Sequence, residues 1–156
     1  MSKAKRWLYS YEKESHELLQ ILARFVTDHL VEQIAAGAQL VQLFESHCAS
    51  LTPDLFQRYS LPYLCQIAQG VRDELQRRQL SPVPVMVFAK DAHYGVEDLA
   101  KSGLFDVISL DWTIPSSLIQ SLRDDHPQLT LQGNLDPCAR YASKENVEKF
   151  VAAMLT

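Results

Sequence analysis

Short apolar segments alternate along the chain with amphipathic segments of helical spacing, and this alternation restricts the fold more than any other feature. The segment 83–89 (VPVMVFA) is almost continuously apolar, as in parallel strands whose two faces are both covered. Repeated strand–helix units predict a parallel sheet with right-handed crossover connections. The four segments predicted as strands are 38–44 (AQLVQLF), 83–89, 106–112 (DVISLDW) and 129–135 (LTLQGNL).

The intervening segments carry helix signals. An opening helix is predicted over about 14–36, because Leu18, Leu22 and Phe25 recur there at helical spacing. Thr52 followed by Pro53 is typical of an N-cap and a first helical residue. Further helices are predicted over 62–78, 96–102, 116–123 and after Ser143, the last with a core face formed by Val147, Phe150, Val151 and Met154.

Composition excludes several classes of protein. With 156 residues and 47% hydrophobic content, a single domain over residues 1–156 is expected. The net charge of −4 provides no basic surface for nucleic acid or an anionic membrane, and no apolar run approaches the roughly 20 residues of a membrane span. The start MSKAKRWLYS lacks the apolar core of a secretion signal. Three cysteines without CxxC spacing favour reduced thiols in the cytosol.

Four strand–helix units are compatible with two architectures, an open doubly wound sheet or half of a (β/α)₈ barrel. In both, ligand chemistry belongs at the carboxyl ends of the strands. Each predicted strand has polar or ionisable residues at this end, whereas the opposite ends have fewer such residues. The four ends read FESH (44–47), AKDAH (89–93), LDWT (110–113) and GNLDP (133–137).

These segments also carry a resemblance. LFESH (43–47), VPVMVFAKDAH (83–93), LDWT and LQGNLDPCARYAS (131–143), in this order and spacing, resemble the uroporphyrinogen decarboxylase family, and AKRWLY (4–9) extends the resemblance to essentially the whole chain. It implies an α/β fold, here a partial (β/α)₈ (TIM) barrel of about four strand–helix units preceded by a helix. It also implies a homodimer and a cofactor-free decarboxylation of the four acetate side chains of uroporphyrinogen III to coproporphyrinogen III.

The resemblance further implies that several family residues have no counterpart within residues 1–156. These are arginines that bind substrate carboxylates, an aspartate that contacts the pyrrole nitrogens, a tyrosine and a late histidine. We therefore expect the middle of a barrel, and no residue of this chain is predicted to be catalytic. Two hypotheses remain open: part of a uroporphyrinogen decarboxylase, inactive by itself, or a non-catalytic half-barrel that associates with itself or with the full-length enzyme.

By resemblance, Ser46 is predicted to bind a substrate carboxylate, with a turn cap as the alternative. Phe44, two residues earlier on the same face, is predicted to wall the pocket, with simple barrel core as the alternative. A nucleophilic pair of Ser46 and His47 is disfavoured, because neighbouring strand residues point to opposite faces and no GxSxG elbow is present. Glu45 and His47 are predicted to make structural contacts on the other face.

No metal is predicted. Related methyltransferases bind zinc through a His-x-Cys pair where this chain has Phe88-Ala89-Lys90, and His47-Cys48 has the wrong spacing. At the same strand end, Lys90 could attract an anionic substrate and Asp91 could orient a loop; a structural role is favoured for the pair. Loop-setting roles are predicted for Asp111-Trp112-Thr113, Gly133-Asn134 and Asp136-Pro137.

Overall fold

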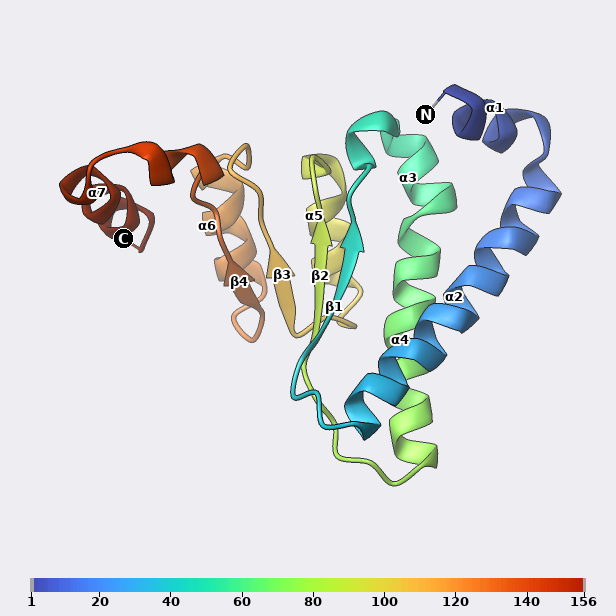
Figure 1. The fold of residues 1–156 in the computed structure, drawn as a ribbon. Coiled ribbons are helices and arrows are strands. Elements are labelled where there is room, and N and C mark those ends of the chain that lie inside the picture. Colours follow the sequence, from blue (N-terminus) through green and yellow to red (C-terminus); the bar gives the residue numbers. More distant parts are fainter. Residues whose placement is uncertain (1, 156) are drawn as a thin grey trace.

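The computed structural model describes residues 2–155 as a four-stranded parallel sheet with helices on one of its faces and at both of its ends (Figure 1). The strands are β1 (Val41–Glu45), β2 (Val85–Ala89), β3 (Val107–Ser109) and β4 (Thr130–Gln132). The α-helices are α1 (Ser2–Ser10), α2 (Glu12–Ala35), α3 (Pro53–Tyr59), α4 (Leu61–Arg77), α5 (His93–Lys101), α6 (Ser116–Asp125) and α7 (Lys144–Leu155). Short 3₁₀ helices are η1 (Cys48–Ser50) and η2 (Pro137–Tyr141).

The strand order is β1-β2-β3-β4, and every neighbouring pair is parallel, which confirms the predicted order. Phe44 lies opposite Phe88, Phe88 opposite Ser109, and Ser109 opposite Gln132. A doubly wound sheet reverses its strand order at a switch point, whereas barrel strands follow one another around the sheet. The uninterrupted order therefore favours an arc of a (β/α)₈ barrel over a doubly wound sheet.

All four predicted strands are longer than the observed ones, and the last two end earlier than expected. Where 106–112 was expected, β3 ends at Ser109, and where 129–135 was expected, β4 ends at Gln132. After β3, the Asp111 carboxylate accepts the backbone N–H of Thr113 at 2.8 Å, a local turn that replaces the strand ladder. After β4, Gly133 has φ +122°, which no regular strand adopts.

The amino-terminal helical region also differs from the expectation. Instead of one opening helix, α1 and α2 meet at Tyr11, and α2 ends at Ala35 just before Gly37, whose φ is +109°. The cap predicted at Thr52 is confirmed, because its Oγ1 accepts the N–H of Leu55 at 3.3 Å. The predicted helices and strands are thus present, but several of them begin or end at other residues than predicted.

Side chains of the strands alternate between a packed face and an open face. Leu43 is 5% exposed and lies against the helices, whereas its neighbour Phe44 is 67% exposed. In an arc of a barrel, the open face is the inner one. Residues of the packed face join one apolar core with α4, α5 and α6; the strands contribute Val41, Leu43, Val85, Val87, Ala89 and Ile108, and Leu110 follows directly after β3.

The apolar face of the last helix corrects one expectation. None of its predicted core residues is buried, and Phe150 is 45% exposed. The reason is position, since α7 packs against η2 at the end of the sheet rather than over its centre (Figure 1). Separately, no helix within residues 2–155 is long and apolar enough to cross a membrane.

Candidate functional site

Polar side chains gather where the four strands end. Ser46 directly follows β1, Asp91 comes two residues after β2, Asp111 two residues after β3, and Asn134 two residues after β4. Because all four strands are parallel and paired in register, these residues share one edge of the sheet, as predicted. We call this edge the rim.

Asp111 is the buried centre of the rim. Its side chain is only 1% exposed, yet it carries a carboxylate. One oxygen, Oδ2, accepts the N–H of Asp91 at 2.7 Å, and the other, Oδ1, accepts both the N–H of Thr113 at 2.8 Å and the Thr113 hydroxyl. Asp111 therefore joins the loop after β2 to the loop after β3.

The ionised form of Asp111 is the one that this environment favours. Burial by itself raises the pKa of the Asp111 carboxyl, but the hydrogen bonds from the Thr113 hydroxyl and from the Asp91 and Thr113 amides outweigh burial. The pKa of Asp111 consequently lies below its ordinary value. An ionised carboxylate can only accept hydrogen bonds, which matches the donors around it.

The same network orients His93, the first residue of α5. Its Nε2 is hydrogen-bonded to the Thr113 hydroxyl and lies 3.9 Å from Oδ1 of Asp111. The hydroxyl of Thr113 has one proton, which it donates to Asp111, so Nε2 of His93 must donate to Thr113. Asp111 thereby fixes the tautomer of His93 through Thr113.

The loop after β4 needs glycine at its first position. Gly133 has φ +122°, and a Cβ there would come within 2.5 Å of the carbonyl oxygen of Leu110. Next to it, the amide of Asn134 donates to the carbonyl of Ile114 at 3.2 Å and ties this loop to the loop after β3. Asp136 accepts the N–H of Cys138 at 2.8 Å, which begins η2. These contacts support the predicted loop-setting roles.

At the end of β1, the two faces of the strand separate structural from exposed groups. Glu45 points toward the helices, where its Oε2 accepts the Ser60 hydroxyl at 3.0 Å, so the structural contact predicted for it is confirmed. Ser46 is exposed, and the exposed ring of Phe44 meets Phe88 edge-on at 6.4 Å between centroids. The predicted roles of Ser46 and Phe44 toward a substrate stay predictions.

Cys48, just beyond β1, is not an activated thiol. It is fully buried, and burial together with the nearby carboxylates of Glu45 and Asp91 raises the pKa of Cys48 to about 12. A nucleophilic cysteine needs a depressed pKa and access to its target. Cys48, the last residue of the segment FESHC, is therefore part of the hydrophobic core.

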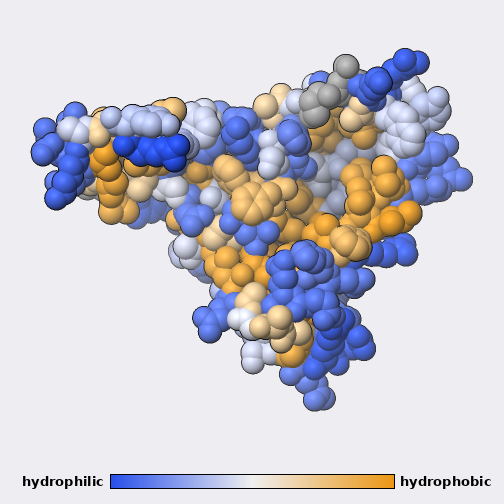
Figure 2. Space-filling model, in the orientation of Figure 1, coloured by the Kyte–Doolittle hydropathy of each residue, from blue (hydrophilic) through white to orange (hydrophobic). Residues whose placement is uncertain are grey.

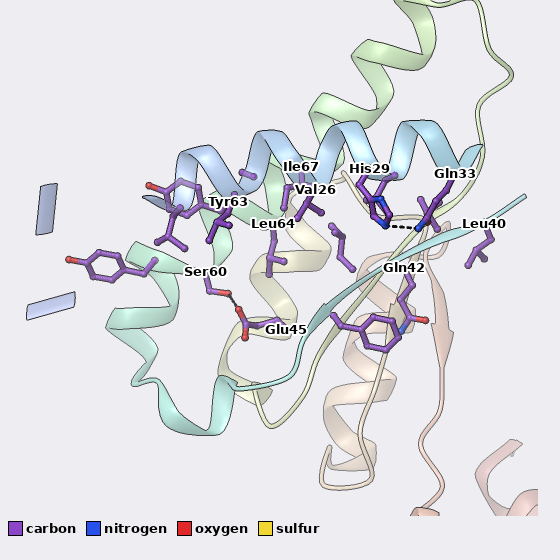
Figure 3. Close-up of a pocket in the computed structure, with 18 residues that line it drawn as sticks. Val26, His29, Gln33, Leu40, Gln42, Glu45, Ser60, Tyr63, Leu64 and Ile67 are labelled. Carbon is purple, nitrogen blue, oxygen red and sulfur yellow. Dashed lines mark hydrogen bonds between the residues drawn. The ribbon is translucent and has the colours of Figure 1, made fainter. Parts of the chain in front are cut away.

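A groove of about 680 Å³ runs along the outer edge of β1, between that strand and α2. Figure 3 shows Val26 of α2 and Leu64 of α4 facing β1 across it, with the Glu45–Ser60 hydrogen bond at one end. On the surface, hydrophobic side chains gather across the middle of this face of the molecule (Figure 2). Among the side chains that line the groove, Leu22, Leu40 and Phe44 are exposed. Further exposed apolar side chains of α2 are Leu18, Ile21 and Phe25.

Among the residues that the structure describes, no group of three or more His, Cys, Asp or Glu side chains is placed to hold a metal ion. We predict that the purified protein contains less than about 0.1 equivalent of zinc, because Phe88-Ala89-Lys90 offers no ligand pair. Elemental analysis after purification without chelators checks this, and one equivalent of retained zinc would contradict it.

Consecutive parallel strands in sequence order, with a polar rim at their carboxyl ends, are the arrangement of (β/α)₈ barrels, whose active sites lie at that rim. The family model described as uroporphyrinogen decarboxylase (URO-D) matches residues 1–156, and the chain belongs to this family. Its fold is accordingly a partial (β/α)₈ barrel, and the resemblance deduced from the rim segments is confirmed.

Individual relatives of this chain belong to the same family. The uroporphyrinogen decarboxylase of Ovis aries is 48% identical over 155 residues, which cover 99% of this chain and 41% of the relative. That of Homo sapiens is 46% identical over 155 residues, with the same coverage, and that of Dictyostelium discoideum is 41% identical over 156 residues, covering 99% of this chain and 41% of the relative. The chain thus spans 41% of the length of these curated relatives.

Two features of the rim were missed in the sequence. The link from Asp111 through Thr113 to His93 joins residues up to 20 positions apart, and no local pattern marks it. Also missed was the register that sets Lys90 beside the end of β1, where the N–H of Lys90 donates to the carbonyl of Glu45 at 3.1 Å. Parallel register depends on packing across the sheet and cannot be read from one strand.

Proposed function

We propose that this chain forms the central part of a uroporphyrinogen decarboxylase, an enzyme that removes carbon dioxide from the four acetate side chains of uroporphyrinogen III without a cofactor. The observation that carries the proposal is the family match over residues 1–156. The position of Ser46 at the rim supports it, because ligands of such barrels bind at the carboxyl ends of the strands.

The chemistry assigns a limited task to this part of the barrel. Protonation of a pyrrole carbon next to the acetate arm makes the ring cationic, and that ring accepts the electrons released as carbon dioxide leaves. A protein then needs to bind the carboxylates, stabilise the developing cation and exclude water. Ser46 contributes a hydroxyl that donates to one carboxylate, and Phe44 contributes an apolar wall beside it.

The wider proposal concerns assembly and location. We infer that residues 1–156 form one domain-sized part of a barrel that works as a homodimer in the cytosol. The family resemblance supports the homodimer, and free cysteines at positions 48, 65 and 138 support a reducing compartment. Neither nucleic acid nor a membrane is part of this proposal, since the net charge is −4.

The experiment is a chimera in which this chain replaces the matching segment of the Ovis aries enzyme. We expect this chimera to form coproporphyrinogen from uroporphyrinogen, with the product measured as coproporphyrin. The unmodified Ovis aries enzyme and the same enzyme with the segment deleted are the controls. A folded chimera without turnover would contradict the proposed function.

Within this chimera, Ser46→Ala should reduce kcat/KM without abolishing turnover. Loss of one hydrogen bond to a charged group costs roughly 1.5–3 kcal/mol, or about ten- to a hundredfold. Steady-state kinetics measure the effect, and Ser50→Ala in η1 serves as the matched control that should leave the rate unchanged. If Ser46→Ala has the rate and KM of the unsubstituted chimera, Ser46 is only a turn cap.

The second candidate function is a non-catalytic half-barrel that associates with copies of itself. The observation that favours it is the open groove beside β1, with Phe25 of α2 68% exposed next to it. Exposed strand edges and apolar faces promote association of this kind. A long apolar face is also open on α2, where Ile21 is 62% exposed.

We predict that the 156-residue polypeptide sediments as dimers or larger species, and that Phe25→Lys shifts it toward the monomer by about tenfold in dissociation constant. Gln20→Lys makes the same change of charge on the same helix, at an exposed polar residue, and should leave the association unchanged. Sedimentation velocity over a range of concentrations measures both variants. A monomeric parent polypeptide would remove the support for this second function.

A further inference from the structure

We propose that Lys90 is a further substrate-binding residue, which pairs with a carboxylate next to the one bound by Ser46. The proposal rests on the proposed function and extends it to a residue for which the sequence favoured a structural role. It follows from the register of β1 and β2, from the way in which the lysine is held, and from the charge along the rim.

The register sets Lys90 level with Ser46. Phe44 pairs with Phe88 and Glu45 with Ala89, and the ladder continues because the N–H of Lys90 donates to the carbonyl of Glu45 at 3.1 Å. One step further along both strands therefore brings Ser46 and Lys90 side by side. Alternation from Phe88 puts Lys90 on the same open face as Phe44.

Trp112 and Asp91 lie close to the ammonium group of Lys90 without accepting a hydrogen bond from it. Nζ of Lys90 lies 5.6 Å from the centroid of the Trp112 ring, a cation–π contact that fixes the direction of the side chain. Its distance to Oδ2 of Asp91 is 3.8 Å, too long for a hydrogen bond. With 38% of its side chain exposed, Lys90 keeps donors free for an incoming carboxylate.

The residue that follows Lys90, Asp91, is anchored through its backbone to Asp111. Asp91 has φ +61°, an unusual conformation for a residue other than glycine, and its N–H donates to the buried carboxylate of Asp111. This bond fixes the backbone directly after Lys90. Trp112 follows Asp111 in the chain, so both partners that orient the ammonium group depend on the same buried anchor.

Lys90 supplies a positive charge next to Ser46, whereas the rim residues Asp91 and Asp111 carry carboxylates. The residues that directly follow the four strands are Ser46, Lys90, Leu110 and Gly133, and Lys90 alone among these carries a charge. A substrate with eight carboxylates needs cations at several points, and an ammonium group beside a hydroxyl suits one acetate or propionate arm. The geometry thus assigns a carboxylate subsite to Lys90 and Ser46 together.

The test compares Lys90→Met, Lys90→Arg and Asp91→Asn in the chimera with the Ovis aries enzyme. Lys90→Met keeps the length of the side chain and removes its charge, so KM should rise about tenfold while kcat stays within about twofold. Lys90→Arg should restore KM to within about threefold of the unsubstituted chimera. Asp91→Asn frees the ammonium group from its carboxylate neighbour and should lower KM by about two- to threefold.

The outcomes separate this inference from the proposed function. An active chimera whose KM is unchanged by Lys90→Met overturns the subsite and leaves the decarboxylase proposal intact. A loss of kcat and of thermal stability at constant KM assigns Lys90 a structural role and also overturns it. A folded but inactive chimera contradicts the proposed function and this inference with it. Opposite shifts of KM in Lys90→Met and Asp91→Asn support the subsite, because a merely structural role would not produce them.

Discussion

The 156-residue polypeptide by itself is expected to show no decarboxylase activity, under conditions in which the chimera with the Ovis aries enzyme turns over. The physical reason is the open inner face of the sheet, where Phe44 is 67% exposed and water has free access. Stabilisation of a cationic ring and binding of several carboxylates require preorganised groups in a site that excludes water. The roles proposed for Ser46 and Lys90 are to orient one or two arms of the substrate, and they include none of that enclosure.

The assay measures coproporphyrin formed from uroporphyrinogen over several hours at micromolar polypeptide. A mock purification from the same expression host measures contaminating host enzyme and sets the detection limit. The polypeptide carrying Ser46→Ala should be indistinguishable from this background as well. Turnover by the unsubstituted polypeptide clearly above the mock sample would show that the described sheet encloses an active site without further chain.

The strand order and the location of the rim could be predicted from the sequence because both depend on local patterns. The apolar run at 83–89 and the polar residues after each strand identify the strands and their carboxyl ends. In a barrel, which the family resemblance implies, consecutive strands lie side by side, so the order of the strands in the sheet follows their order in the chain. The family resemblance came from the same rim segments.

The remaining features depend on contacts between segments that are distant in the chain. Whether Lys90 stands beside Ser46 is decided by the register of β1 and β2, and the burial of Asp111 is decided by donors from the loops after β2 and β3. An apolar stripe also does not reveal what covers it. Phe25 and Phe150 lie on helices with the expected spacing, yet both side chains are exposed in the structure.

Asp111→Asn is expected to lower the free energy of unfolding of the chimera by about 2–4 kcal/mol at pH 7. Both carboxylate oxygens accept hydrogen bonds, Oδ2 from the N–H of Asp91 and Oδ1 from the N–H and hydroxyl of Thr113. An asparagine of the same shape keeps one acceptor and turns an NH₂ group toward an N–H donor on the other side. With the side chain 1% exposed, water cannot replace the lost partner.

The pH dependence of this difference identifies the ionised carboxylate as its cause. Because the pKa of Asp111 is lowered in the folded protein, its stabilising contribution is fully present above the unfolded value near 3.9 and is lost as the pH falls through the folded value. The difference between the chimera and its Asp111→Asn variant should therefore be constant from about pH 5 to 7 and shrink below about pH 4.

Urea denaturation at several pH values measures both effects. Asp124→Asn makes the same chemical change on the exposed surface of α6, where the Asp124 carboxylate accepts the Gln120 amide at 2.8 Å, and should change stability by less than about 0.5 kcal/mol. A small effect of Asp111→Asn, equal to that of Asp124→Asn, would show that the loops after β2 and β3 hold their positions without the carboxylate. A large effect that persists unchanged to pH 3 would assign it to the shape of the side chain instead of its charge.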